Sequence, residues 1–516
     1  MVIGSGFAGL SAASFLAKAG WKVTVLEKND GPGGRARQLK ADGFVFDMGP
    51  SFYWMPDVFE RYFAQFGKKV SDYYTLDRLD PSYRVYWEEG HTDMAADFET
   101  LKKTFEQIEP GSGAQLEKYL QEALVKYKVG MGRFVHKPGL SLTEFMNWET
   151  ISGALKLQLL TSISKHVAKH FKHPRLRQLM EFPVLFLGAL PQDTPALYSL
   201  MNYADIKEGT WFPRGGMYAV VEAMYKLALE LGVEFKFNES VRAFEVGDNA
   251  GGTQQGLAPR EGANDLDSAS AARKVAGAKA SITAVVSSSG TYRADAIISG
   301  ADYHFTEQQL LPAAYRVYNE SYWQKRVMAP SCLMYYVGLN KKLKDPVHHS
   351  LFFDVSFAKH GQEIYKDPQW PTEPQFYVSV SSATDPSVAP PGCENIVFLI
   401  PVASGLTGDD ESLRERYFNK IVTRLEKHLG ESIKDSIVYK KMYSVADFKD
   451  DYNSFKGNAY GLANTLMQTA VFRPACQSKK VRNLFYTGQL TVPGPGVPPS
   501  LISGEVVASV CDRAFK

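Results

Sequence analysis

Six residues near the start of the chain have the types and the spacing of a site for a phosphate-bearing cofactor. Residues 4–9 read Gly-Ser-Gly-Phe-Ala-Gly and stand between an apolar run at 1–3 and an alanine- and leucine-rich stretch at 10–19. The first glycine of such a turn permits a tight bend, the second admits a pyrophosphate, and the third lets helix pack on strand. The dipole and the free N–H groups of the helix would face the phosphates.

A second strand completes this unit. Residues 21–26 read Trp-Lys-Val-Thr-Val-Leu and are followed by Glu27. A carboxylate at this strand tip can accept hydrogen bonds from a ribose diol. Because strand, glycine turn, helix, strand and acidic tip fall within one βαβ length, they predict a dinucleotide-binding domain rather than a chance glycine pattern.

The turn after Glu27 carries a cation. Residues 28–35 read Lys-Asn-Asp-Gly-Pro-Gly-Gly-Arg. Alone, this is readable as a Gly/Pro turn with a solvated arginine. Joined to the preceding unit, it resembles the second half of the FAD fingerprint of the amine-oxidase-like flavoproteins, which include monoamine oxidases and carotenoid desaturases. The resemblance implies that Glu27 holds the adenosine ribose and Arg35 the pyrophosphate.

Strand-like runs recur far from the N-terminus. They occupy 232–238 with a continuation at 241–244, then 292–302, and finally 483–488, and a helical pattern at 218–231 precedes the first. These runs and the N-terminal unit form one sheet only if the chain leaves and re-enters the domain twice. At 516 residues the chain also exceeds one typical hydrophobic core.

We therefore expect an α/β protein with two domains. A Rossmann-like FAD-binding domain would be discontinuous and built from three tracts, 1–74, 206–309 and 456–516. A second, α+β substrate domain that faces a membrane would comprise 75–205 and 310–455. Residues 248–281 are rich in Gly, Ser, Ala and Lys with almost no aromatic residues, so we expect a disordered surface insertion there.

Segments elsewhere in the chain make the resemblance more specific to one group of these flavoproteins. Residues 483–504 are similar to the C-terminal FAD segment of carotenoid desaturases, in which a strand ends in glycine, a Pro/Gly-rich loop follows, and a helix begins beside the flavin ring. Similar patterns occur at 43–51 and 211–217. Together with stretches at 182–189 and 458–465 they resemble the bacterial-type phytoene desaturases over nearly the whole chain. The cofactor-binding residues that follow from the motifs and the resemblance are Gly4, Gly6, Gly9, Glu27, Gly34, Arg35, Gly49, Pro50, Val241, Gly488 and Val497.

The resemblance implies stepwise desaturation of phytoene toward lycopene, with FAD as the hydride acceptor. Phytoene is a C40 hydrocarbon, so its recognition depends on shape and apolar burial. The aromatic content of 13% suits a long apolar tunnel, although an aromatic-rich core explains it equally well. A helix that begins near Ser500 could stabilise the negative charge of the reduced flavin. No catalytic base is assigned, and neither Glu144 nor Glu149 is chosen.

Alternatives within the flavoenzymes are a hydroxycarotenoid desaturase and a carotenoid isomerase that uses reduced FAD. An amine oxidase would need an aromatic cage and often a covalent flavin, for which the sequence gives no sign. A non-enzymatic carrier of prenyl chains on the same fold is a different class, but such carriers do not rely on bound FAD. Flavin absorbance of the purified protein would disfavour that class.

Partners and location follow from composition and from the resemblance. The net charge of +2 argues against a nucleic-acid partner. Four distant cysteines without a CxxC motif fit a reduced, cytoplasmic setting. With three residues before the glycine turn we expect no signal peptide, and no apolar run reaches membrane-spanning length. The resemblance implies peripheral membrane attachment, and reoxidation of FAD by oxygen or a quinone rather than by a nicotinamide.

One basic, amphipathic tract allows two interpretations. Apolar residues recur every four positions from 151 to 171, among many lysines and arginines. The pattern fits a surface helix packed on a core, or an interfacial helix on anionic lipid. Within it, His166, His170 and His173 have helical spacing, but neighbouring lysines would repel a metal ion. We therefore predict a basic helix face and no metal site.

Overall fold

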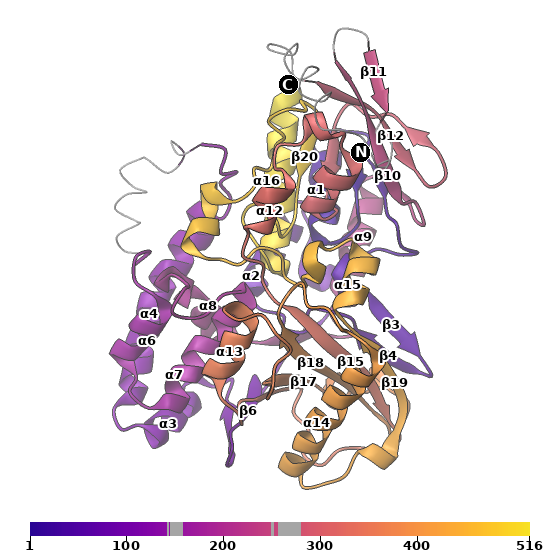
Figure 1. Ribbon diagram of the computed structural model, residues 1–516. Helices are drawn as coiled ribbons and strands as arrows, with labels where there is room; N and C mark the ends of the chain where they lie inside the picture. The colour runs from indigo at the N-terminus through magenta and orange to yellow at the C-terminus, as the bar shows by residue number, and fades with distance from the viewer. Residues whose placement is uncertain (142–143, 145–157, 249–251, 256–279) are drawn as a thin grey trace.

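A computed structural model describes residues 1–141, 144, 158–248, 252–255 and 280–516. Both chain ends lie in the same region of the molecule, next to α1 (Phe7–Lys18) and α16 (Val497–Phe515), and a large sheet occupies the opposite region (Figure 1). Within the described ranges, no helix combines the length and the apolar character that crossing a bilayer requires.

A five-stranded parallel sheet positions the glycine turn. Its order is β20-β14-β1-β2-β9 and all four pairings are parallel. The strands are β1 (Val2–Ile3), β2 (Thr24–Leu26), β9 (Glu234–Lys236), β14 (Ile297–Ser299) and β20 (Leu484–Tyr486). They come from all three predicted tracts of the chain, which confirms the discontinuous Rossmann-like architecture. The domain boundaries themselves stay a prediction.

Helices cover one face of this sheet. Apolar residues of β1, β2, β14 and β20 pack with α1 and α16 in one buried cluster. The predicted helix at 218–231 is confirmed as α9 (Tyr218–Glu230), which packs on α1. Gly504 of α16 approaches α1 so closely that a methyl group there would contact the Ala8 carbonyl oxygen at 2.5 Å.

A second, antiparallel sheet covers the other face. Its order is β11-β10-β12-β13, with β10 (Val241–Asp248), β11 (Gly252–Gln255), β12 (Ser281–Ser287) and β13 (Thr291–Tyr292). The prediction that 241–244 continues the strand at 232–238 is wrong, because the chain turns at Asn238, which has φ 56°, and enters this other sheet. Most of the predicted insertion at 248–281 lies outside the described residues, but Gly252–Gln255 pair with β10.

A seven-stranded mixed sheet forms the second domain, in agreement with the predicted α+β substrate domain. Its order is β19-β15-β18-β17-β16-β6-β7, and only the β16–β6 pairing is parallel. Helix α14 (Glu411–Leu429) packs on one face. The strands are β6 (Tyr83–Tyr86), β7 (His91–Met94), β15 (Ser331–Leu339), β16 (His349–Phe352), β17 (Phe376–Ser379), β18 (Glu394–Val402) and β19 (Ile437–Tyr443).

Helices gather beside this sheet (Figure 1). They are α3 (Phe98–Ile108), α4 (Ser112–Val129), α6 (Ile163–His170), α7 (Pro174–Glu181) and α8 (Leu200–Tyr203). Within the amphipathic tract, Ile163, Val167 and Phe171 are fully buried in the core. A surface helix packed on a core is therefore what the described part of this tract forms; residues 151–157 lie outside the described ranges.

Shorter elements connect these layers. They are α2 (Pro56–Ala64), α11 (Tyr303–Phe305), α12 (Glu320–Gln324), α13 (Phe357–Tyr365), α15 (Val445–Tyr452) and the strand pairs β3 (Gln38–Ala41) with β4 (Phe44–Asp47) and β5 (Leu76–Arg78) with β8 (Trp211–Pro213).

Candidate cofactor and active site

A cavity of about 290 Å³ lies where the three tracts of the parallel sheet meet. Side chains or backbone from the N-terminal turn, from β10, and from the loop before α16 line it together. All eleven residues that the sequence assigns to the cofactor line this one cavity: Gly4, Gly6, Gly9, Glu27, Gly34, Arg35, Gly49, Pro50, Val241, Gly488 and Val497.

The glycine turn depends on close backbone approach. Gly4 has φ 87°, and its N–H donates to the Leu26 carbonyl at 2.8 Å. A methyl group on Gly9 would lie 3.0 Å from the Gly4 carbonyl carbon and still closer to its oxygen, which van der Waals repulsion forbids. The Gly33 N–H donates to the Ser5 carbonyl at 2.9 Å, so the second glycine-rich loop is held against the first.

Glu27 is buried at the tip of β2, and the protein already supplies donors to both carboxylate oxygens. Oε2 accepts from the N–H and the hydroxyl of Ser5, both at 2.8 Å. Oε1 accepts from the N–H of Asn29 at 2.9 Å and from its side-chain amide at 3.0 Å. A ribose diol would therefore have to share these oxygens or replace a donor.

Arg35 is a partly buried cation without a carboxylate in hydrogen-bond contact. Its Nη2 donates to the Ser454 hydroxyl at 3.1 Å and to the Asn458 carbonyl at 3.4 Å, and its Nε has no partner among the described residues. Burial lowers the pKa of the guanidinium, and the Asp302 carboxylate opposes this shift. A phosphate would satisfy both the charge and the free donor, so the site fits a pyrophosphate.

The helix that follows the Pro/Gly-rich loop begins earlier than the sequence suggested. Gly496 is the N-cap of α16, so the helix starts at Val497 and Ser500 lies in its first turn. Proline is tolerated at the first helical positions, which explains how Pro498 and Pro499 stand inside the helix. They carry no N–H, and the Ser500 N–H is bonded to Gly496, so this terminus offers few free donors.

One face of the seven-stranded sheet reaches the cavity. Met334 on β15 pairs directly with Leu399 on β18, and both line the cavity, as does Cys332 two positions before Met334. Sequence reasoning missed these residues because β15 is buried along its whole length and shows no alternation. They place an apolar surface next to the cofactor loops.

Tyr460 also lines the cavity, and its loop is firmly held. The Asn458 carboxamide oxygen accepts from the Gly461 N–H at 2.7 Å and from Gln489 Nε2 at 3.1 Å. Burial raises the pKa of the Tyr460 phenol, so the hydroxyl stays protonated.

Of the two acidic residues considered as bases, Glu144 does not line this cavity. Glu144 accepts from the backbone N–H groups of Gly139, Leu140 and Ser141, at 3.0–3.2 Å. It organises a turn and does not line the cavity. Glu149 lies outside the described residues, so no catalytic base is assigned.

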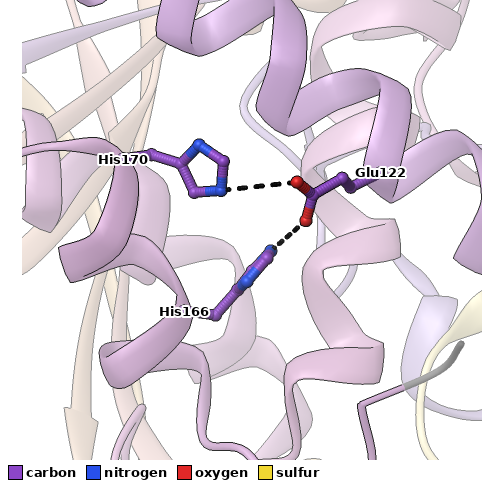
Figure 2. Close-up of side chains that lie close together, drawn as sticks. All are labelled: Glu122, His166 and His170. Carbon is purple, nitrogen blue, oxygen red and sulfur yellow. Dashed lines mark ion pairs between the residues drawn. The ribbon is translucent and has the colours of Figure 1, made fainter. Parts of the chain in front are cut away.

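A second cluster of polar side chains lies away from the cavity (Figure 2). His166 Nε2 and His170 Nε2 are each 3.8 Å from an oxygen of Glu122, an arrangement that could hold a metal ion. The ammonium of Lys126, however, lies 3.2 Å from the same His166 Nε2. It also donates to the Ser199 hydroxyl at 3.0 Å. Because the ammonium already uses the nitrogen that a metal would need, we interpret these side chains as an internal polar cluster. The predicted basic helix face describes the exposed Lys165 and Lys169 but not His166, which is buried.

This competition can be measured with Zn²⁺. Burial lowers the pKa of Lys126 to about 8, and burial and Lys126 together lower that of His166 to about 3. We expect no change in the unfolding temperature of the wild type on adding Zn²⁺. Lys126→Met should gain roughly 2–4 °C from Zn²⁺, and adding His170→Gln should abolish the gain. Stabilisation of the wild type would contradict the prediction.

Comparison with known proteins also indicates a flavin-binding protein. Residues 7–269 match the sequence profile of the family described as flavin containing amine oxidoreductase. The chain is 38% identical to a carotenoid 3,4-desaturase of Haloarcula japonica, covering 98% of this chain and 96% of that protein. It is 30% identical to a phytoene desaturase of Fusarium fujikuroi, covering 100% and 90%.

Solved structures support the fold alone. An oxidoreductase of Methanosarcina mazei superposes with a TM-score of 0.59 at 14% identity, over 99% of this chain and 98% of that one. The family profile and the sequence relatives identify the chain as an FAD-dependent oxidoreductase that belongs to the carotenoid desaturases within the flavin-containing amine oxidoreductases.

Proposed function

We propose that this protein desaturates phytoene stepwise toward lycopene. The observation that carries the proposal is the apolar sheet face of Cys332, Met334 and Leu399, which meets the cofactor cavity without offering a charged group. Such a surface suits a hydrocarbon, whose binding free energy comes from burial. Bound FAD would supply the two-electron acceptor, and the chain would orient the substrate. The phytoene desaturase relative at 30% identity supports the same reaction.

Desaturation of the 3,4 bond near the end of a carotenoid is the second candidate. The relative at 38% identity carries that name. Tyr460 also favours it, because its hydroxyl has no hydrogen-bond partner among the described residues while it borders the cavity. A substrate that bears a hydroxyl close to the reacting bond would satisfy this phenol, whereas a hydrocarbon would leave it unpaired.

Product analysis separates the two candidates. The purified FAD-bound protein is incubated in separate reactions with phytoene, lycopene and a hydroxylated lycopene in liposomes, and the pigments are identified by mass. Conversion of phytoene supports the first proposal, and conversion of only the other two supports the second. Isomerised product without loss of hydrogen would contradict both and favour an isomerase. Oxygen or a quinone as electron acceptor is tested by repeating the active reaction without air, with and without added quinone.

We further propose that the protein docks on a membrane through an apolar rim. We use this name for six exposed residues, Leu140, Leu160, Val327, Leu466, Met467 and Phe472. Leu160 is 93% exposed and Met467 64%. Val327 bonds to Gln468 through both its N–H and its carbonyl, which joins it to the segment of Met467. Thr161, next to Leu160, accepts from the Ala196 N–H at 2.7 Å, and Tyr198 bonds to Thr469. Gly139, next to Leu140, lies against Ala470, where an added methyl group would be 3.5 Å from the carbonyl oxygen. Exposed apolar side chains gathered in this way are typical of a lipid-contacting surface.

Negatively charged substitutions in the apolar rim should weaken the binding of the protein to lipid. We expect Met467→Asp with Phe472→Asp to weaken binding to anionic liposomes about tenfold, because the apolar contacts are lost. Flotation with liposomes measures the effect, and the flavin absorbance of the variant serves as the folding control. Val438→Asp, at an exposed position on β19 outside the rim, should bind like the wild type. Equal binding by the rim variant would contradict this docking surface.

A further inference from the structure

Arg473 packs against the loop at 489–496, which leads into α16 and contributes residues to the cavity wall. The residue is 4% exposed. Its Nη1 donates to the carbonyls of Gln489 at 3.1 Å and Thr491 at 3.4 Å. Its Nη2 donates to the Leu462 carbonyl at 3.1 Å and to the Asn464 side-chain oxygen. The guanidinium therefore joins two loops, 462–464 and 489–491, at the back of the cavity.

All four acceptors of this guanidinium are neutral. No carboxylate of the described residues lies within ion-pair distance, and Nε has no hydrogen-bond partner there. Burial lowers the pKa of Arg473 to about 10, with partial compensation from Tyr198 and Tyr322, so the group remains charged at neutral pH. A buried charge without a counterion is costly, and its presence calls for an anion nearby.

Two other arginines, one buried and one largely buried, do have such a counterion. Arg84 pairs with Asp93 at 2.7 Å and with Asp345 at 3.0 Å. Arg424 pairs with Asp354. Arg35 also has no carboxylate in contact and lines the cofactor cavity, where a pyrophosphate is expected. Lys126 lacks a carboxylate partner too, but it is held by neutral side chains away from the cavity. Because Arg473, unlike Lys126, bonds to a residue of the cavity wall, we look for its anion in the cavity.

The position of Arg473 relative to the cavity supports this. Gln489, Gly496 and Val497 line the cavity, and the first of them gives its carbonyl to Arg473. A methyl group on Gly494 would lie 3.1 Å from Nη2, so the guanidinium packs against the chain just before α16. Arg473 itself does not line the cavity, so it acts through the wall and is a positioning residue.

The N-terminus of α16 has few free N–H groups of its own with which to stabilise a negative charge. Two prolines remove N–H groups from its first turn, and the Ser500 N–H is bonded within the helix. The helix dipole alone is worth a partial charge. A full positive charge in a buried setting interacts more strongly with a developing negative charge than a dipole does.

We propose that Arg473 is the counter-charge for the reduced flavin. Desaturation breaks two C–H bonds, and the two electrons and one proton that leave as hydride give the reduced ring one negative charge, while the other proton goes to water. Arg473 stabilises that negative charge and so raises the affinity of the bound flavin for electrons. The proposal depends on FAD and is independent of which carotenoid is the substrate.

Sulfite tests the proposal without any carotenoid, because it adds to oxidised flavin and leaves a negative charge on the ring. The FAD-bound wild type is compared with Arg473→Met and Arg473→Lys by spectrophotometric titration and by the flavin midpoint potential. We expect Arg473→Met to bind sulfite about tenfold more weakly and to have a more negative potential. Arg473→Lys keeps the charge and should stay within about threefold of the wild type.

Arg326→Met is the matched control. Its guanidinium stacks on the Tyr322 ring, 4.4 Å from the ring centroid, and does not line the cavity. We expect sulfite affinity like that of the wild type.

Two results would overturn the proposal. One is an Arg473→Met protein that holds FAD and binds sulfite like the wild type. The other is an Arg473→Lys protein that has lost affinity as much as Arg473→Met, because then hydrogen-bond geometry and not charge matters. If Arg473→Met does not retain FAD, Arg473→Lys decides alone: affinity near that of the wild type supports the proposal, and a loss beyond tenfold refutes it.

Discussion

Gly9→Ala is expected to yield a protein that purifies without flavin colour. The added methyl group would overlap the Gly4 carbonyl group, so the turn between β1 and α1 must open. Opening the turn moves the N-terminus of α1 away from the position where it faces the phosphates. Overpacking of this kind costs about 1–3 kcal/mol, so FAD affinity should fall roughly a hundredfold. Flavin absorbance per protein and titration with FAD measure the loss.

Gly290→Ala is the control for this substitution. Gly290 lies in the turn before β13, and no atom would lie within 4 Å of the added methyl group. That variant should keep its FAD and its unfolding temperature. If Gly9→Ala retained flavin as firmly as this control, the glycine turn would not be the phosphate site.

Arg35→Met should also lose FAD, but for an electrostatic reason and not a steric one. Methionine fills much of the same buried volume but removes the positive charge and the free Nε donor that face the cavity. Charge-assisted hydrogen bonds contribute about 1.5–3 kcal/mol each, so we expect FAD affinity to fall roughly a hundredfold. Because the missing interaction is electrostatic, FAD affinity of the wild type should depend more on salt than that of the variant.

Arg37→Met provides the comparison within the same turn. Arg37 forms an ion pair with Asp451 and does not line the cavity. Its loss should affect stability slightly and leave FAD binding unchanged. Unaltered flavin occupancy in Arg35→Met would exclude the phosphate role of Arg35.

The residues that local patterns assign to the cofactor line one cavity, for a physical reason. A glycine turn, an acidic strand tip and a neighbouring Gly-Gly-Arg are contiguous in sequence, and each depends on backbone geometry that few residues can adopt. Gly4 and Gly9 could therefore be proposed as cofactor residues from the local motif, and Arg35 from the resemblance that its neighbouring turn carries. The five strands were also visible, because short apolar runs bounded by glycine are the signal of a buried parallel strand.

The substrate side could not be predicted in the same way. β16 pairs with β6, more than 250 positions earlier, and no local pattern encodes such a pairing. β15 is buried on both faces, so its sequence does not reveal that Met334 and not Leu333 faces the cavity. The start of α16 was placed too late because Pro498 and Pro499 resemble a loop in sequence, although the first helical turn accepts them.

The pairing of distant segments has a consequence for biosynthesis. β20 adds to the edge of β14, and α16 covers α1, so segments more than 450 positions apart complete one another. A ribosome that has made the N-terminal βαβ unit leaves apolar residues of α1 uncovered until α16 emerges. We therefore expect the nascent chain to need chaperone protection, and flavin capture to occur only after α16 has been made.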